Sequence, residues 1–315
     1  MIFVNFGIIH LILLGILFSF ITFLFVLKLI ILNLSTKQQI TTKNFEKQEF
    51  TENIENENPE NEIYKNFTKT HDPSTQEKKA EKNKTNWTEF SKMGSFKISS
   101  LDFFGNLDIL VRNIIFFGLI FHIIYYFWNH FTQGTFTLAK YLPLHICNLS
   151  TYLLVIAILG IKLNKKWSSQ YATLVYYWSL IPASLALIFP DLQSRDIWNF
   201  EFIEFFWSHT LIVAGCFYLL FFGNLKTNFK FVPLAIVILA VFGLGLIYPL
   251  NLALGSNYMY LNRLTATGPM SQFPTPPLHL LVFIFLLLFF YSGQFLVLRI
   301  LNFIWQRYFG KVAGE

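Results

Sequence analysis

Seven long apolar runs constrain this chain more than any other feature of its sequence. Each is close to the length, about 20 residues, at which an α-helix crosses the hydrocarbon core of a bilayer. None sustains the alternation of apolar and polar residues that a barrel strand needs, and backbone groups in lipid must be bonded internally, so helices are expected. The runs are Ile8–Ile31, Leu110–Trp128, Leu142–Leu163, Tyr171–Phe189, Phe202–Phe222, Phe231–Leu250 and Leu278–Ile304. The sequence therefore predicts an all-α, polytopic membrane helix bundle.

The charged residues also indicate a membrane protein, because half of them are confined to one segment. Residues 35–100 hold 11 Lys and 11 Asp or Glu, which is 22 of the 42 charged residues in a chain of 315. The other 249 residues carry only 20 charges, far below the roughly one in four of soluble domains. This excludes a soluble globular fold. The diffuse net charge of +6 argues against a nucleic-acid binder, and two Cys cannot form a disulfide scaffold.

The distribution of apolar and polar residues predicts four parts: an anchor helix (1–34), a cytoplasmic linker (35–100), a six-helix core (101–306) and a short tail (307–315). The first run lacks the basic start and cleavage site of a signal peptide, so we interpret it as an uncleaved transmembrane anchor. The linker cannot bury enough apolar area to offset its ordering entropy, and we expect it to be disordered. A protein partner could dock on it, which is the alternative to a simple tether.

Basic residues in the short loops predict the orientation of the chain. They follow the third, fifth and seventh runs, whereas the other short loops contain few: the residues are Lys162, Lys165, Lys166, Lys226, Lys230, Arg307 and Lys311. Because basic loops stay in the cytoplasm, we expect the amino terminus outside and the carboxy terminus inside. The chain is accordingly predicted to be a multi-pass protein of the cell membrane.

With this orientation, most of the unusual polar residues in the six-helix core lie near its outer face. Ionisable residues inside membrane spans are costly and indicate function. We place Cys147, His209 and His145 in a candidate catalytic set. His209 is expected about 10 Å below the outer end of its helix at 1.5 Å per residue. The candidate substrate-binding residues are His122, Asp191, Asn257, Tyr258, Tyr260 and Arg263.

Cys147 is the candidate nucleophile of this set. Pro143 suits the first position of a helix, which would put Cys147 near a helix amino end, where the dipole lowers the pKa of a thiol. In a helix regular from Pro143, residues 145 and 147 would point about 200° apart. His145 would then be a poor direct base, His209 the better candidate and His122 the third choice. The alternative for each residue is ordinary packing inside a span.

Four short strings together resemble a known family. They are L-P-L-H-I-C-N-L-S from Leu142 to Ser150, F-P-D-L from Phe189 to Leu192, F-F-W-S-H from Phe205 to His209 and G-S-N-Y-M-Y-L from Gly255 to Leu261. They resemble the YwaF-like bacterial integral membrane proteins over residues 105–304. That family is similar to a human transmembrane phospholipid acyltransferase thought to use a cysteine thioester, and more remotely to Thr/His intramembrane lipid hydrolases. The resemblance implies that Cys147 is the nucleophile and His209 the base.

The preferred hypothesis is an intramembrane acyl-transfer enzyme, a lipid acyltransferase or lipid hydrolase, with membrane lipids of the outer leaflet as its partners. The runner-up is a non-catalytic substrate-capture component of a transporter, although the second run offers only Gly118 as a small docking residue. A third reading places zinc at His145, His209 and Asp191, but no paired H-x-x-x-H spacing supports it. We therefore predict no metal and no cofactor.

Overall fold

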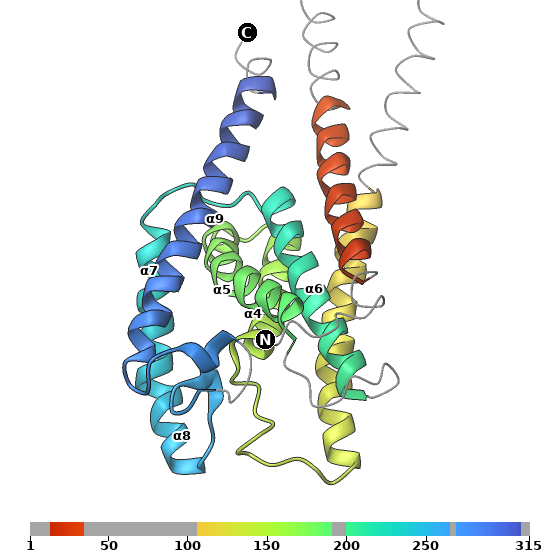
Figure 1. Cartoon of the computed structure of the whole chain (residues 1–315). Helices are drawn as coiled ribbons and strands as arrows, with labels where there is room; N and C mark the ends of the chain where they lie inside the picture. Colours follow the sequence, from red (N-terminus) through yellow and green to blue (C-terminus); the bar gives the residue numbers. More distant parts are fainter. Residues whose placement is uncertain (1–12, 35–105, 191–199, 265–268, 310–315) are drawn as a thin grey trace, which may run out of the picture. The chain divides into compact units, whose positions relative to one another are not determined.

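The computed structural model describes residues 13–34, 106–190, 200–264 and 269–309, and every regular element in them is helical (Figure 1). Six of these helices are long and apolar enough to cross a membrane: Leu13–Leu34, Asn106–Thr132, Ser168–Ile188, Phe202–Phe222, Phe231–Leu254 and His279–Arg307. A shorter apolar helix, Ile146–Lys162, accounts for the remaining run. The prediction of an all-α, polytopic membrane protein is confirmed. Asp191 and the predicted linker, 35–100, lie outside the described residues.

Contacts within the chain divide the described residues into two units. Residues 13–26, 110–190, 200–264 and 269–304 belong to the first unit, and residues 27–34, 106–109 and 305–309 belong to the second. In the second unit the Lys28 ammonium group lies 5.8 Å from the centroid of the Trp305 ring, a cation–π distance. All candidate site residues that the structure describes lie in the first unit.

The helices from residue 146 onward carry the labels of Figure 1. They are α4 (Ile146–Lys162), α5 (Ser168–Ile188), α6 (Phe200–Phe222), α7 (Phe231–Phe242), α8 (Tyr248–Leu254) and α9 (His279–Phe309). A π-helical turn, η1 (Gly243–Ile247), joins α7 to α8, and two 3₁₀ turns, η2 (Tyr258–Tyr260) and η3 (Pro269–Gln272), precede α9. The sixth apolar run is thus one helix widened by a single π turn, a feature often found near functional sites.

Helices α4, α5 and α6 pack side by side and form the centre of the first unit (Figure 1). The helix Asn106–Thr132 joins them at Gly215 of α6. A Cβ atom placed on Gly215 would lie 3.3 Å from the Leu154 side chain and 3.6 Å from that of Ile115. Leu154 and Ile115 are themselves buried. Because a small residue lets helix backbones approach closely in a membrane, Gly215 sets the junction at which these three helices meet.

Helix α4 begins at Ile146, so the prediction that a regular helix starts at Pro143 is wrong. His145 is the N-cap and has an extended backbone, with φ −69° and ψ 144°. The backbone N–H of Leu142 instead donates to the Tyr258 hydroxyl at 3.0 Å, and this loop contact holds the segment around Pro143 outside the helix. The angle of 200° expected between His145 and Cys147 therefore does not apply.

Candidate functional site

The contacts at Gly215 relate the positions of residues on three helices. Seven residues are close to two helical turns and about 10 Å of rise, so a residue seven positions away returns to nearly the same face. His122 lies seven residues after Ile115, nearer the Thr132 end of the same helix. Cys147 lies seven residues before Leu154 in α4. His209 lies six residues before Gly215, and six residues turn a helix by about 600°, so His209 points about 120° away from the face of Gly215.

A second glycine contact confirms this register between two of the helices. A Cβ atom on Gly118 would lie 3.1 Å from the Leu211 side chain of α6. His122 lies one helical turn after Gly118 in the first helix. Glu204 lies two turns before Leu211 in α6. The His122 Nε2 atom lies 3.6 Å from Glu204 Oε1. The side chain of His122 is only 6% exposed and that of Glu204 18%, so the pair is largely shielded from the surroundings.

His209 is held in one orientation by its own helix. Its Nδ1 atom lies 2.7 Å from the carbonyl oxygen of Phe205, and its ring centroid lies 4.2 Å from that of Phe205. A carbonyl oxygen only accepts, so Nδ1 carries the proton and Nε2 presents a lone pair. His209 is buried and is an electrostatic neighbour of His122. The arrangement gives His209 the tautomer that a general base requires.

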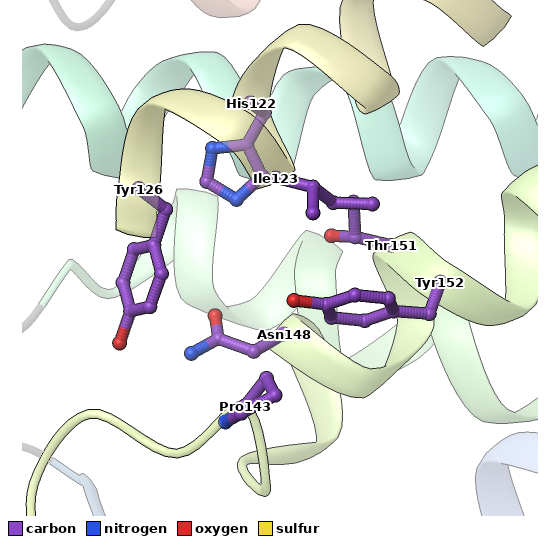
Figure 2. A pocket seen from close by; sticks show the side chains of 7 residues that line it. All are labelled: His122, Ile123, Tyr126, Pro143, Asn148, Thr151 and Tyr152. Atoms are coloured by element: carbon purple, nitrogen blue, oxygen red, sulfur yellow. The ribbon is translucent and has the colours of Figure 1, made fainter. Parts of the chain in front are cut away.

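A small pocket lies between the helix Asn106–Thr132 and the first two turns of α4. Its cavity volume is about 10 Å³, roughly the space that one water molecule needs. Its lining residues are His122, Ile123, Tyr126, Pro143, Asn148, Thr151 and Tyr152. Figure 2 shows the Tyr152 hydroxyl group pointing into the space bounded by His122, Tyr126 and Asn148. The lining is mostly apolar, and it contains no Lys, Arg, Asp or Glu.

Cys147 adjoins this pocket as the second residue of α4. Its thiol forms no disulfide, and the residue is half-buried. Thr151, one turn later on the same face, lines the pocket and donates a hydrogen bond to the Cys147 carbonyl at 3.5 Å. The first hydrogen bond of the helix runs from Leu149 N–H to His145 C=O at 2.9 Å. The N–H groups of Cys147 and Asn148 therefore have no acceptor within α4.

No hydrogen bond in the part of the chain that the structure describes joins the Cys147 thiol to a histidine. Contacts between a nucleophile and its base are often long without substrate and tighten in the complex. The other cysteine, Cys216 of α6, is also free and is completely buried. As a residue, Cys147 is half-buried, whereas Cys216 is completely buried.

The loop after α8 is anchored by Asn251, which is completely buried. Its Oδ1 atom accepts from the Ser256 hydroxyl at 2.7 Å and from the Tyr258 N–H at 2.8 Å. Its Nδ2 group donates to the Tyr258 carbonyl at 3.0 Å. The Tyr258 hydroxyl then donates to the Leu138 carbonyl at 2.6 Å. Asn251 thus connects α8, through Tyr258, to the segment that leads into α4.

His145 joins the same loop from the start of α4. Its Nδ1 atom accepts a hydrogen bond from the Met259 N–H at 3.4 Å, and its ring lies 5.5 Å from that of Tyr260. Met259 and Tyr260 both have a positive φ, 57° and 54°, a conformation that costs energy in residues with a side chain. The Nε2 atom of His279, the first residue of α9, lies at hydrogen-bond distance, 3.0 Å, from the Tyr260 carbonyl oxygen. Burial lowers the pKa of His145 because the charged imidazolium loses solvation.

The remaining predicted residues form hydrogen bonds within their own loop. Asn257 Oδ1 accepts from the Arg263 N–H at 3.0 Å, and its Nδ2 donates to the Arg263 carbonyl at 2.8 Å. The exposed Arg263 guanidinium reaches the Gly255 carbonyl at 3.4 Å. Substrate-binding roles for these residues, for Tyr258 and for Tyr260 stay predictions. Asp191 lies outside the described residues.

Reasoning from the sequence missed three residues at the site: Glu204, Asn148 and Tyr152. Glu204 had a usable signal, because it is the one acidic residue in the run Phe202–Phe222 and ionisable residues in spans indicate function. Asn148 and Tyr152 had none, because their role depends on which face of α4 meets the neighbouring helix. Within the described residues, no group of three His, Cys, Asp or Glu side chains converges as metal ligands.

The sequence profile of the TMEM164 family matches residues 5–293. No curated protein and no solved structure is significantly similar to the chain. The matched range includes every candidate site residue and extends beyond the six-helix core to the first apolar helix, whereas the resemblance to YwaF-like proteins covered residues 105–304.

Proposed function

The chain belongs to the TMEM164 family, a family of transmembrane proteins, and from this premise we propose that it is an intramembrane acyl-transfer enzyme. Cys147 is the nucleophile and His209 its general base. One observation supports the proposal: His209, whose Nδ1 atom lies 2.7 Å from the Phe205 carbonyl oxygen, is an electrostatic neighbour of His122, and His122 lines the pocket beside the start of α4, the helix that carries Cys147. The earlier resemblance to a cysteine-dependent phospholipid acyltransferase names the same two residues.

The chemistry follows from the tautomer of His209 and the position of Cys147. The Nε2 lone pair of His209 removes the thiol proton, and the thiolate attacks the carbonyl carbon of a lipid ester. The C–O bond breaks, the proton passes from His209 to the departing alcohol, and a thioester remains on Cys147. The N–H groups of the first turn of α4, which have no acceptor within that helix, are suited to stabilise the oxyanion formed on the way.

The surroundings of the site suit a lipid ester as the acyl donor. Next to His122 on the same helix, Phe121 is 58% exposed, and one turn earlier Phe117 is 63% exposed. Such residues face acyl chains when a helix lies in a bilayer. A lipid could therefore approach the site from the membrane, with its ester group entering between the helices near the end of α4.

The proposal is tested by trapping the acyl-enzyme. Purified protein is incubated with vesicles of phosphatidylcholine that carries an alkynyl acyl chain, and attached label is detected after gel electrophoresis. We expect labelling that hydroxylamine removes, as it does from a thioester. Cys147→Ser should abolish the labelling, and His209→Gln should slow it by roughly 10²-fold or more.

Cys216→Ala is the matched control, because it removes the only other thiol and leaves the site unchanged. It should be labelled like the unaltered protein. Labelling that persists in a folded Cys147→Ser variant, or that depends on Cys216, would overturn the assignment of Cys147.

A further inference from the structure

We propose that two basic loops of the first unit together bind the anionic headgroup of a phospholipid, through Lys165 and Lys166 of one loop and Lys226 and Lys230 of the other. The first loop connects α4 to α5 and comprises residues 163–167, and the second connects α6 to α7 and comprises residues 223–230. The inference goes beyond the proposed function, because Cys147 lies at the start of α4 and these loops follow the far ends of α4 and α6.

The first loop is fixed by contacts of its own backbone. The Lys165 N–H donates to the Gly160 carbonyl at 3.0 Å, and the Lys165 carbonyl accepts from the Ser168 N–H at 3.0 Å. The Trp167 ring packs over Gly160, where a Cβ atom would lie only 2.9 Å from it. The side chains of Lys165 and Lys166 therefore extend from a backbone with a defined position at the beginning of α5.

Side chains of α5 hold the second loop against the first two turns of that helix. The Ser169 hydroxyl donates to the Asn224 carbonyl oxygen, and the Thr173 hydroxyl oxygen accepts from the Lys226 N–H at 2.9 Å. Because Ser169 lies three residues after Lys166, both basic loops lie beside the same stretch of α5. The flexible stems of lysine let its ammonium groups converge on one ligand between the loops.

The lysines at this end of the helices are exposed and have no acidic partner. They are Lys162, Lys165, Lys166, Lys226 and Lys230, all of them exposed. Residues 160–170 and 223–232 contain no Asp or Glu, and within the described ranges no carboxylate pairs with any of these lysines. Clustered like charges repel one another, and an anion placed between them offsets that repulsion.

Exposed aromatic residues next to these lysines favour a lipid over a soluble anion. Trp167 is 46% exposed and directly follows Lys166, and Phe229 is 51% exposed and directly precedes Lys230. Exposed Trp is typical of the headgroup level of a membrane, where basic residues attract anionic lipids. A phosphate bound by the lysines would therefore belong to a lipid whose acyl chains lie against the neighbouring helices.

The positive-inside rule explains why each of these loops is basic, but it does not explain why they are joined. The rule concerns the charge of a loop during insertion and does not depend on where the loop lies in the folded protein. The hydrogen bonds of Ser169 and Thr173 bring together two basic loops that are separated in sequence by the whole of α5 and α6. This placement is the observation that carries the inference.

The basic residues of both loops are all lysines, which indicates how the site selects its lipid. A lysine ammonium group is a compact charge without the planar fork of arginine, so it recognises charge more than shape. We expect phosphatidylglycerol, which has a net negative charge, to bind more tightly than phosphatidylcholine, whose phosphate is balanced by its own choline group. The predicted topology assigns this lipid to the cytoplasmic leaflet.

The experiment measures the binding of single lipid molecules to the full-length protein. Purified protein in detergent is titrated with dioleoyl phosphatidylglycerol, and bound lipid is counted by native mass spectrometry. We expect Lys165→Gln and Lys226→Gln each to weaken the tightest binding event by roughly fivefold, because one lipid contacts both loops. The unaltered protein should bind dioleoyl phosphatidylcholine more weakly than phosphatidylglycerol by a similar factor.

Lys140→Gln is the matched control, because Lys140 is also exposed but precedes α4 and so lies at the other end of that helix. It should bind phosphatidylglycerol like the unaltered protein. Thr173→Val keeps every lysine and removes the acceptor of the Lys226 N–H. It should weaken binding as well, which diffuse attraction to two separate loops would not predict. Unfolding temperatures in the same detergent show that the variants are folded.

Four outcomes would overturn the inference. They are equal weakening in Lys140→Gln, unchanged binding in folded Lys165→Gln and Lys226→Gln variants, unchanged binding in folded Thr173→Val, and equal affinity for the two lipids. Competition by glycerol 3-phosphate at the concentrations at which phosphatidylglycerol binds would show a site for a soluble anion and would overturn the assignment to a lipid. None of these measurements depends on Cys147, so the lipid site and the proposed acyl transfer can fail separately.

Discussion

His145 is the residue through which the loop after α8 contacts the start of α4. Its unprotonated Nδ1 atom accepts a hydrogen bond from the Met259 N–H, and burial lowers its pKa below the ordinary value of 6.5. Protonation would break that hydrogen bond. In the structure, His145 therefore acts in the neutral form, and its contribution is to position the residues that follow it, Cys147 among them.

This geometry predicts a stability that depends on pH. Because the pKa of His145 is lower when folded than when unfolded, the unfolded chain binds a proton first as the pH falls. Stability is then complete above the unfolded pKa and is lost as the pH drops below it. His145→Asn, which keeps an acceptor at the position of Nδ1, should lose less thermal stability than the unaltered protein between about pH 7.5 and pH 5. Equal losses in both proteins would contradict this role.

Asn251 predicts a larger effect, which does not depend on pH. Asn251→Ala removes the partner of the Ser256 hydroxyl and of both backbone groups of Tyr258. Leaving such buried groups unpaired costs about 1–3 kcal/mol. We expect a lower unfolding temperature in detergent and slower labelling of Cys147. Leu252→Ala, at a residue 64% exposed, is the control and should change neither; no difference between the two variants would argue against the anchor.

At the scale of elements, the close approach at Gly215 holds the candidate site together. Gly215→Val would force branched atoms against Leu154 and Ile115, which already lie 3.3 and 3.6 Å from the position of a Cβ. Overpacking of this kind costs about 1–3 kcal/mol. Because the junction determines how α4 packs against α6 and the helix Asn106–Thr132, labelling of Cys147 should fall as well.

Gly293→Val is the matched control, since no atom lies within 4 Å of a Cβ placed on that glycine of α9. It should leave the labelling rate unchanged. The comparison is made from unfolding temperatures and initial labelling rates of the two variants in the same detergent. A Gly215→Val variant that labels at the normal rate would show that the junction does not control the site.

The helices themselves could be predicted from the sequence because each depends on a local property, a long run of apolar residues. All seven runs correspond to apolar helices. The start of α4 could not be predicted, because Pro143 satisfies a local rule while the segment is held by Tyr258, more than a hundred residues away. The contact of Glu204 with His122 also depends on how two helices pack, which no single run of sequence records.

At the scale of the whole molecule, the positive-inside rule makes a prediction about topology. The amino terminus should lie outside the cell membrane and the carboxy terminus in the cytoplasm. A protease added to intact cells should remove an amino-terminal tag and leave a carboxy-terminal tag, and inverted vesicles should give the reverse. The opposite result would move the candidate site to the inner leaflet without changing its internal geometry.

The account depends most on one covalent bond, the thioester between an acyl chain and Cys147. The measurement is the intact mass of the purified protein after a brief incubation with vesicles of a single phosphatidylcholine. We predict a fraction of molecules heavier by one acyl group, with the added mass on the peptide that contains Cys147 and removed by hydroxylamine. No added mass on a folded protein, or added mass that remains in Cys147→Ser, would contradict the account.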